Sequence, residues 1–97
     1  MKLFVIARAM SRPESATALA AAMLKNRDAS RREPGCVRYE VARSATDARV
    51  LITVEEWRDR AAFDQHMQTA HVAELLAAVP ELVAASPEIS VFEPLTP

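Results

Sequence analysis

Two segments of this 97-residue chain carry apolar side chains on both faces of a predicted strand. In residues 3–10, Leu3 and Val5 point to one face while Phe4 points to the other, and residues 49–57 repeat the pattern. A sheet with helices on one side normally shows polar residues on the other. Both faces of these strands therefore need cover, and a chain this short has few elements to supply it.

A first helix is predicted after the first strand. Residues 11–14 are a helix-entry signal, with the first two residues outside the helix and Pro13 and Glu14 in its first turn. Helical spacing continues to about Arg31, and the predicted inward stripe is Ala16, Leu19, Ala20, Met23 and Arg27. Gly35, the only glycine, is predicted to supply a turn conformation that other residues resist.

The second half of the chain is predicted to form a hairpin, two short helices and a last strand. The hairpin pairs residues 36–43 with 49–57. Asp59 and Thr69 are predicted helix caps, and the prolines at 80 and 87 are predicted to interrupt the segment before the last strand. In the first strand of the hairpin, Val37, Tyr39 and Val41 are predicted to share one face. In the second of the two helices, the predicted inward residues are Val72, Leu75, Leu76 and Val79. The last strand is predicted to contain Ile89, Val91 and Phe92.

The element order is strand, helix, strand, strand, helix, strand. This order predicts an α+β, ferredoxin-like split βαβ fold with a four-stranded antiparallel sheet and its helices on one face. Residues 1–97 are expected to make a single domain. Because the second face of the sheet is also apolar, we expect a homodimer in which two sheets pack face to face.

Composition excludes several classes of function. The net charge is −1 and the arginines are scattered, which argues against nucleic acid as a partner. No apolar segment is long enough for a membrane span or a signal peptide. The single cysteine, Cys36, indicates a reducing compartment and is predicted to be a small buried hydrophobe rather than a nucleophile. The cytoplasm is the expected location.

The candidate site lies at the end of the third strand and in the helix after it. Glu55 and Trp57 are two residues apart in a strand, so they project from the same face. His66 lies three residues after Phe63, beside the apolar stripe of the next helix. If that stripe packs on the sheet, a carboxylate, an indole and an imidazole converge in one crevice.

These residues resemble a known family. The segment from Glu33 to Tyr39, the Glu55-x-Trp57 pair, and Phe63-x-x-His66 followed by His71 are similar to the antibiotic biosynthesis monooxygenase domain. The resemblance implies a dimeric α+β barrel with a pocket between the sheet and the helices of each subunit.

Enzymes of this family oxidise quinols, phenols or anthrones with molecular oxygen and without a cofactor or metal. The resemblance therefore implies a small phenolic or polycyclic aromatic substrate that, once deprotonated, reduces oxygen itself. His66 is then the candidate base. The candidate substrate-binding residues are Trp57, Tyr39, Glu55, His71 and Arg8.

Each of these residues also has a structural interpretation. His66 and Trp57 can be core residues, and Tyr39 can be a strand residue with its hydroxyl at the rim. Glu55 can pair with an arginine of the neighbouring strand. His71 can complete a helix start, and Arg8 can form a salt bridge at the barrel rim.

Two other functions are alternatives to this one. Haem degradation uses the same fold but needs an asparagine on the first strand, where this chain has Ala7-Arg8-Ala9. A metal site is not predicted, because His66 and His71 would lie about 140° apart on a continuous helix and face different ways. The second alternative function is a dimer that binds a small molecule, or is purely structural, and has no turnover.

Overall fold

The computed structural model describes residues 1–96, which form four strands and three helices. Their bounds are β1 Leu3–Met10, α1 Ala16–Ser30, β2 Cys36–Arg43, β3 Val50–Trp57, α2 Arg60–His66, α3 Ala70–Leu82 and β4 Glu88–Phe92. The strands make one antiparallel sheet in the order β2-β3-β1-β4. This is the predicted α+β, ferredoxin-like split βαβ arrangement.

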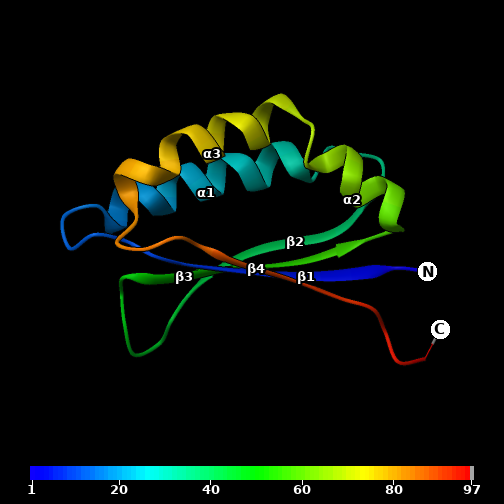
Figure 1. Ribbon diagram of the computed structural model, residues 1–97, viewed down its shortest axis with the longest axis horizontal. Helices are drawn as coiled ribbons and strands as arrows, with labels where there is room; N and C mark the ends of the chain where they lie inside the picture. Colours follow the sequence, from blue (N-terminus) through cyan, green and yellow to red (C-terminus); the bar gives the residue numbers. More distant parts are fainter. Residues whose placement is uncertain (97) are drawn as a thin grey trace.

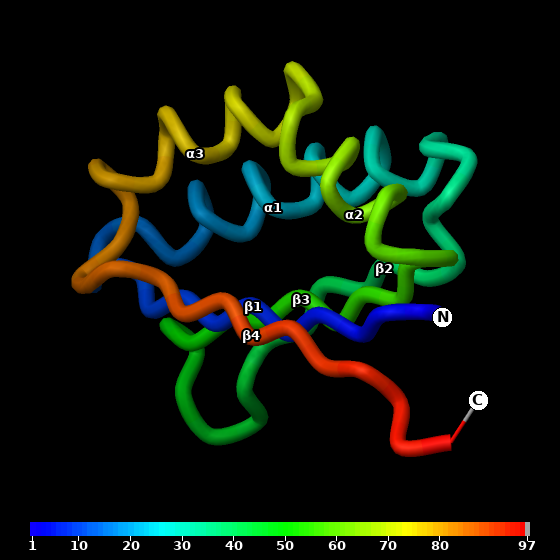
Figure 2. The backbone as a smooth tube through the Cα atoms, turned by 45° about the vertical axis from the view of Figure 1, so that its right-hand side comes forward, coloured from blue at the N-terminus to red at the C-terminus, as the bar shows by residue number. Residues whose placement is uncertain are grey.

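The helices form a single layer above the sheet. All three lie on the same face (Figure 1), and α1 and α3 run side by side while α2 lies over one end (Figure 2). No helix within residues 1–96 is both long and apolar enough to cross a bilayer.

The pairing register assigns each strand residue to a face of the sheet. Leu3 lies opposite Trp57, and both are buried against Phe63 of α2. Ile6 and Phe92 belong to the opposite set and point away from the helices. They are 41% and 48% exposed, so the apolar second face predicted from the sequence is present and uncovered in the single chain.

The core is divided into two apolar clusters. One contains Leu3, Val5, Tyr39, Trp57, Ala62 and Phe63, and the other contains Ala9, Leu19, Met23, Leu51 and Val83. The opposed pair Ala7 and Thr53 separates them along the sheet. The buried side chains around this junction are polar, and they include Thr53, Glu55, Asn26 and His66. Burying polar groups costs stability unless they are paired, so a cluster of them in the core indicates a functional site at this junction.

Helix α1 ends at Ser30 with Arg31 as its C-cap, as predicted, but its start and its inward stripe differ from the prediction. It begins at Ala16 rather than at Pro13, because the backbone N–H of Ser15 donates to the carbonyl of Arg12 and closes a turn first. The inward stripe continues from Met23 to Asn26 rather than to Arg27. The buried positions are Leu19, Met23, Asn26 and Ser30, which keep the helical period with two polar residues.

The two predicted caps are confirmed. The Asp59 side chain accepts a hydrogen bond from the backbone N–H of Ala62 at 2.8 Å, and Thr69 accepts one from Val72 at 3.4 Å. These caps start separate helices, α2 and α3, so the chain turns between them. That turn is decisive for the site.

Pro80 does not end helix α3, which runs on to Leu82. A proline lacks a backbone N–H, so it removes one bond of the helix. The Arg12 side chain donates to the carbonyls of Pro80 and Val83 from outside the helix, both at 3.3 Å. The last turn is therefore held by a residue from the β1–α1 connection.

The register of β2 shifts at its start. The irregularity lies between Cys36 and Arg38, and it leaves Val37 60% exposed. Tyr39 is buried as predicted, but the expectation that Val37 shares its face is wrong. The extra residue of the bulge pushes Val37 out of the alternation.

Gly35 is required for close packing rather than for an unusual turn. Within residues 1–96 no glycine has a positive φ, so the prediction of a special turn conformation is wrong. A Cβ atom at Gly35 would overlap the Cβ of Ala62 in α2. The carbonyl of Gly35 also accepts a hydrogen bond from the backbone of Arg58 at 2.8 Å. The start of β2 therefore lies so close to helix α2 that only glycine fits at position 35.

Replacing Gly35 by alanine should lower the free energy of unfolding by about 1–3 kcal/mol, because the new methyl group overpacks the contact with Ala62. Alanine also restricts the unfolded chain more than glycine does. This effect raises the free energy of unfolding, but by only about 0.4–1 kcal/mol. Urea unfolding measures the difference. Adding Ala62→Gly should restore most of the lost stability, and an unchanged urea midpoint in the single variant would contradict the packing argument.

Candidate active site

His66, the last residue of α2, lies at the centre of the buried polar group. It is only 3% exposed, and its ring packs on the indole of Trp57 with centroids 4.3 Å apart and planes inclined by 34°. Phe63, one turn earlier in the helix, lies 6.3 Å from the imidazole centroid. The predicted convergence of the imidazole and the indole is therefore present.

Glu55 supplies the predicted carboxylate beside them. It is 5% exposed and accepts hydrogen bonds from Trp57 Nε1 at 3.0 Å and Thr53 Oγ1 at 2.7 Å. Burial raises the pKa of Glu55 above its usual range, against the opposing effects of these two hydrogen bonds and of His66. Its Oε1 lies 4.0 Å from His66 Nε2, too far for a direct hydrogen bond.

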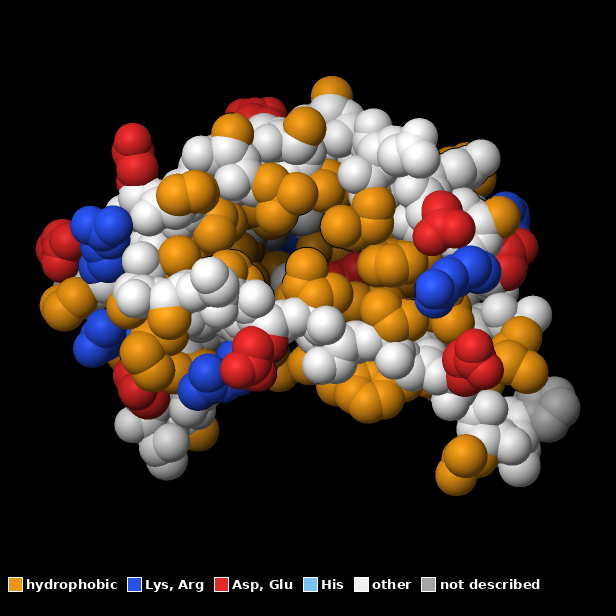
Figure 3. Space-filling model, in the orientation of Figure 1, with side chains coloured by type: hydrophobic (Ala, Val, Ile, Leu, Met, Phe, Trp, Pro, Cys, Tyr) orange, Lys and Arg blue, Asp and Glu red, His pale blue; other side chains and the backbone are white. Residues whose placement is uncertain are grey.

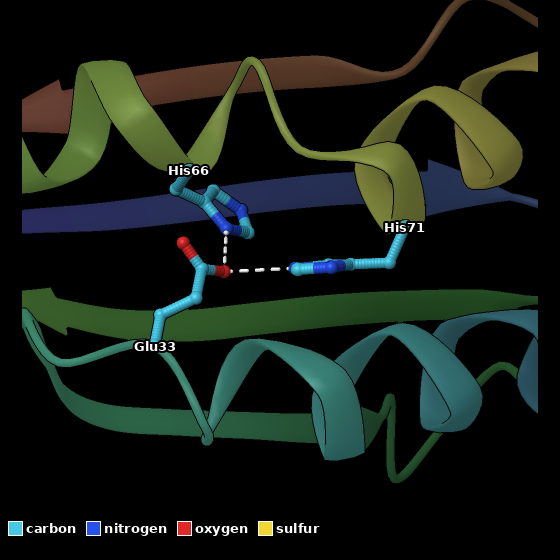
Figure 4. A group of neighbouring side chains, drawn as sticks. All are labelled: Glu33, His66 and His71. Carbon is cyan, nitrogen blue, oxygen red and sulfur yellow. Dashed lines mark hydrogen bonds and ion pairs between the residues drawn. The ribbon is translucent and has the colours of Figure 1, made fainter.

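Glu33 joins the two histidines, and this contact was not predicted. Its Oε2 lies 2.7 Å from His66 Nδ1 and 2.8 Å from His71 Nε2. Figure 4 shows the carboxylate between the two rings, with the histidines coming from different helices. The prediction that His66 and His71 face different ways is wrong.

The error has a local cause. The angle of about 140° applies to a continuous helix, but α2 ends at His66 and α3 starts after Thr69. The hydroxyl of Thr69 donates to the carbonyl of His66 at 2.7 Å, which holds the turn between the helices. That turn re-aims His71 toward Glu33.

Tyr39 and Asn26 complete the buried polar group. Asn26 Nδ2 donates to the Tyr39 hydroxyl at 2.9 Å, and the Tyr39 and His66 rings lie 6.0 Å apart. Burial raises the pKa of Tyr39, which keeps the phenol protonated. Asn26 Oδ1 is buried and has no hydrogen-bond partner among residues 1–96. A polar atom left unpaired at such a place is free to bind a ligand or water.

A cleft opens beside His66, between α3 and the strands β1 and β4. Its inner part has a volume of about 60 Å³ and is lined by Val5, Ala7, Asn26, Glu55, Phe63, His66, Met67, Val72, Leu75, Leu76 and Ile89. An adjoining part of about 80 Å³ shares Ala7, Leu75, Leu76 and Ile89 with it. Figure 3 shows a hollow on this side of the molecule, with hydrophobic side chains around it. The site is therefore a mostly apolar cleft with a few polar groups at its base.

Arg8 is not brought into this group. Arg8 pairs with Ile52, whereas Val5 pairs with Glu55. Arg8 is three residues from Val5 along β1, so the two side chains point to opposite faces of the sheet. The exposed side chain of Arg8 therefore belongs to the open face of the sheet, away from Glu55. The position does not support Arg8 as a pocket cation.

The arrangement gives His66 the elements of a general base. A carboxylate accepts hydrogen bonds, so the short contact with Glu33 places the proton on Nδ1 of His66. Nε2 is then the acceptor, on the side of the ring where Glu55 and the cleft lie. A histidine oriented in this way by a carboxylate is a common arrangement for proton abstraction.

Two residues of the site were missed in the sequence, Glu33 and Asn26. Glu33 was noted only as part of a motif before β2, and nothing local points its side chain at a helix that begins 27 residues later. Asn26 carried a usable signal, because it lies three residues after the buried Met23 on the helical period.

Residues 2–86 match the family described as antibiotic biosynthesis monooxygenase. The chain belongs to this family. A curated relative from Mycobacterium tuberculosis, "Putative monooxygenase Rv0793", is 36% identical over 91 residues, which cover 94% of this chain and 89% of the relative. A Synechocystis protein, "Uncharacterized protein sll1783", is 36% identical over 64 residues, or 66% of this chain. That match covers 44% of the longer Synechocystis protein.

Solved structures agree with this membership. The structure of Rv0793 superposes with a TM-score of 0.94 at 33% identity and covers 100% of this chain and 98% of its own. A structure from Nitrosomonas europaea titled "Putative antibiotic biosynthesis monooxygenase" has a TM-score of 0.92 at 25% identity, covering 99% and 92%. PA3566 from Pseudomonas aeruginosa has a TM-score of 0.91 at 27% identity, covering 98% and 95%. The predicted family and fold are confirmed.

Cys36 lies at the edge of the site and has the environment of an unreactive thiol. It is half-buried and packs against the cluster that contains Trp57. Burial, followed by the charges of Glu33 and Glu55, raises the pKa of Cys36 to about 11. This supports the interpretation of Cys36 as a small packed hydrophobe.

The Cys36 thiol should react about tenfold more slowly with a disulfide reagent in the folded protein than in urea at pH 8. The raised pKa lowers the thiolate fraction about a hundredfold, and the greater nucleophilicity of the more basic thiolate recovers about a factor of ten. Stopped-flow kinetics measure both rates, with a short peptide of residues 33–39 as the unfolded control. Equal rates in the folded protein and the peptide would contradict the raised pKa.

Proposed function

We propose that this member of the antibiotic biosynthesis monooxygenase family is a cofactor-independent monooxygenase that acts on a small phenol or quinol. The observation that carries the proposal is the orientation of His66. Its Nδ1 is held by Glu33, which leaves Nε2 as an acceptor beside an apolar cleft. The family membership and the printed name of the Mycobacterium relative support monooxygenase chemistry.

The first step of the proposed reaction is the removal of a proton from the substrate. Nε2 of His66 takes a proton from the phenol, or from the ring carbon in its keto form, and the substrate becomes an electron-rich anion. This anion reduces molecular oxygen. For a phenol, one oxygen atom replaces a ring hydrogen and becomes the second carbonyl of a quinone, while the other oxygen atom leaves as water with the two hydrogens that the substrate loses. A quinol gives a hydroxyquinone and water by the same balance. The developing anion is stabilised by donated hydrogen bonds, for which the Nδ2 amide of Asn26 is a neutral candidate, because Asn26 lines the cleft and uses one of its two Nδ2 hydrogens for Tyr39.

The size of the cleft favours a small ring. A cavity of about 150 Å³ holds benzene in an engineered protein. The two connected parts of this cleft measure about 60 and 80 Å³, so together they suit one ring better than a polycycle. We therefore place a single-ring quinol or phenol ahead of an anthrone as substrate.

Oxygen uptake with a panel of hydroquinones and anthrones tests this proposal. The metal-free wild-type protein should consume oxygen in proportion to substrate, and His66→Gln should lose about 10²–10⁴-fold in rate, because glutamine keeps hydrogen-bonding capacity but cannot take the proton. Asp64→Asn, on the exposed face of the same helix, is the matched control and should keep the wild-type rate.

Two outcomes would count against the proposal. One is a wild-type rate in a folded His66→Gln variant. The other is ligand-induced thermal stabilisation without oxygen uptake, which supports the alternative of a binding dimer with no turnover.

We also propose that the protein is a homodimer. The open face of the sheet carries Phe4, Ile6, Ile52, Val54 and Phe92. Arg8 and Glu56 lie on the same face, but the five residues still form an apolar patch that is unfavourable in water, and a second copy with the same surface covers it. The occupant we propose is therefore a second copy of this chain, packed sheet to sheet, which would make the dimeric α+β barrel.

The variant Ile6→Lys should convert the dimer to a monomer, because it places a charge at the centre of the proposed interface. Leu24→Lys is the matched control, since Leu24 is 38% exposed on α1, close to the 41% of Ile6. Light scattering after size-exclusion chromatography measures both masses. A monomeric wild-type chain, or an Ile6→Lys variant that stays dimeric, would rule out this interface.

A further inference from the structure

Three potential metal ligands meet where the connection before β2 lies against the junction of α2 and α3. They are Oε2 of Glu33, Nδ1 of His66 and Nε2 of His71, and all three atoms lie within 4.8 Å of one another (Figure 4). We propose that these residues form a binding site for a divalent cation of the zinc class, and that its occupation controls the base proposed above.

The donor set selects the class of metal. Two imidazoles and one carboxylate suit zinc and its first-row neighbours. Calcium and magnesium require mainly oxygen ligands, which the two histidines do not provide. Three protein ligands leave one position of a tetrahedral ion for water or another small ligand.

The geometry requires only a small opening of the group. Ligands at about 2.0–2.1 Å from a tetrahedral ion lie about 3.3 Å from one another. The carboxylate oxygen now lies 2.7 and 2.8 Å from the two nitrogens, as in a hydrogen-bonded group without metal. Side chains can make this adjustment, because Glu33 lies in a connection outside any helix or strand and His71 is partly exposed.

The surroundings of His66 provide independent support. A histidine bound to a metal through one nitrogen commonly directs its other N–H to a carboxylate. Nε2 of His66 is 4.0 Å from Oε1 of Glu55, a carboxylate fixed by Thr53 and Trp57. This distance is longer than a hydrogen bond, so the ring has to shift slightly toward Glu55 when Nδ1 binds the ion. The Glu55 carboxylate, the His66 imidazole and the proposed metal position are therefore in the required order.

The proposed ion affects the cleft only through the His66 ring. Nδ1 and Nε2 lie on different sides of the imidazole, and the cleft adjoins the Nε2 side. Coordination through Nδ1 keeps the proton on Nε2, so His66 can no longer accept a proton from a substrate. The cation is thus an inhibitor in this proposal, and this consequence rests on the proposed function, whereas binding does not.

Zinc binding is tested on the untagged, metal-free protein by calorimetry with Zn²⁺ and by the visible spectrum of Co²⁺. We expect one ion per chain and cobalt bands of a four- or five-coordinate site. Removal of an outer partner of a metal ligand costs about 10–100-fold in affinity, so loss of a ligand itself in His71→Ala should cost at least about tenfold. Glu33→Gln is a second variant that removes a ligand. It tests the site if His71→Ala does not fold.

Glu81→Gln serves as the control, because it removes an exposed carboxylate from the same helix as His71. It should leave the zinc affinity unchanged. Absence of binding up to about 1 mM Zn²⁺, or unchanged affinity in folded His71→Ala and Glu33→Gln, would overturn the site and leave a purely hydrogen-bonded group.

Oxygen uptake separates this proposal from the function. Saturating Zn²⁺ should suppress the His66-dependent rate, and a chelator should restore it. If zinc binds at the predicted residues but the metal-free protein oxidises nothing, the metal site stands and the proposed function fails. If zinc binds there and the rate is unaffected, the inhibitory role is overturned.

Discussion

The contact of one carboxylate oxygen with two imidazoles holds the functional end of this protein together. Glu33 lies before β2, His66 ends α2 and His71 is in the first turn of α3, so the contact joins the β2 end of the sheet to two successive helices more than 30 residues further along the chain. Hydrogen bonds to a charged acceptor are roughly twice as strong as neutral ones, and these two are short. The orientation of His66, and with it the face presented to the cleft, is a consequence of this contact.

The rest of the site is placed where the apolar core is interrupted. Trp57 packs beneath His66 and also donates to Glu55, so a single side chain supplies both apolar packing and a hydrogen bond. Glu55 uses both of its oxygens as acceptors, which makes its burial tolerable. Asn26 is the exception, since its Oδ1 is left unpaired beside the cleft. A fold that needed only stability would have no reason to keep these groups at its centre.

Much of the fold was predictable because it rests on local rules. Alternation in the strands predicted β1 and β2 within their observed bounds, and the caps Asp59 and Thr69 are explained by the hydrogen bonds that helix starts require. The same alternation placed Glu55 beside Trp57. Prediction failed for Val37, where a bulge breaks the alternation, and for Gly35, whose constraint comes from Ala62 in a distant helix.

The sequence by itself determined the order and the faces of the elements, the buried Trp57 with its neighbour Glu55, and the apolar second face of the sheet. These are consequences of side-chain period, which is a property of consecutive residues. Only the tertiary structure decided that Glu33 meets His66 and His71. That meeting depends on the turn between α2 and α3, which Thr69 and His66 hold locally, and on how closely β2 approaches α2. The approach is set by the contact of Gly35 with Ala62, two residues remote from one another in the chain.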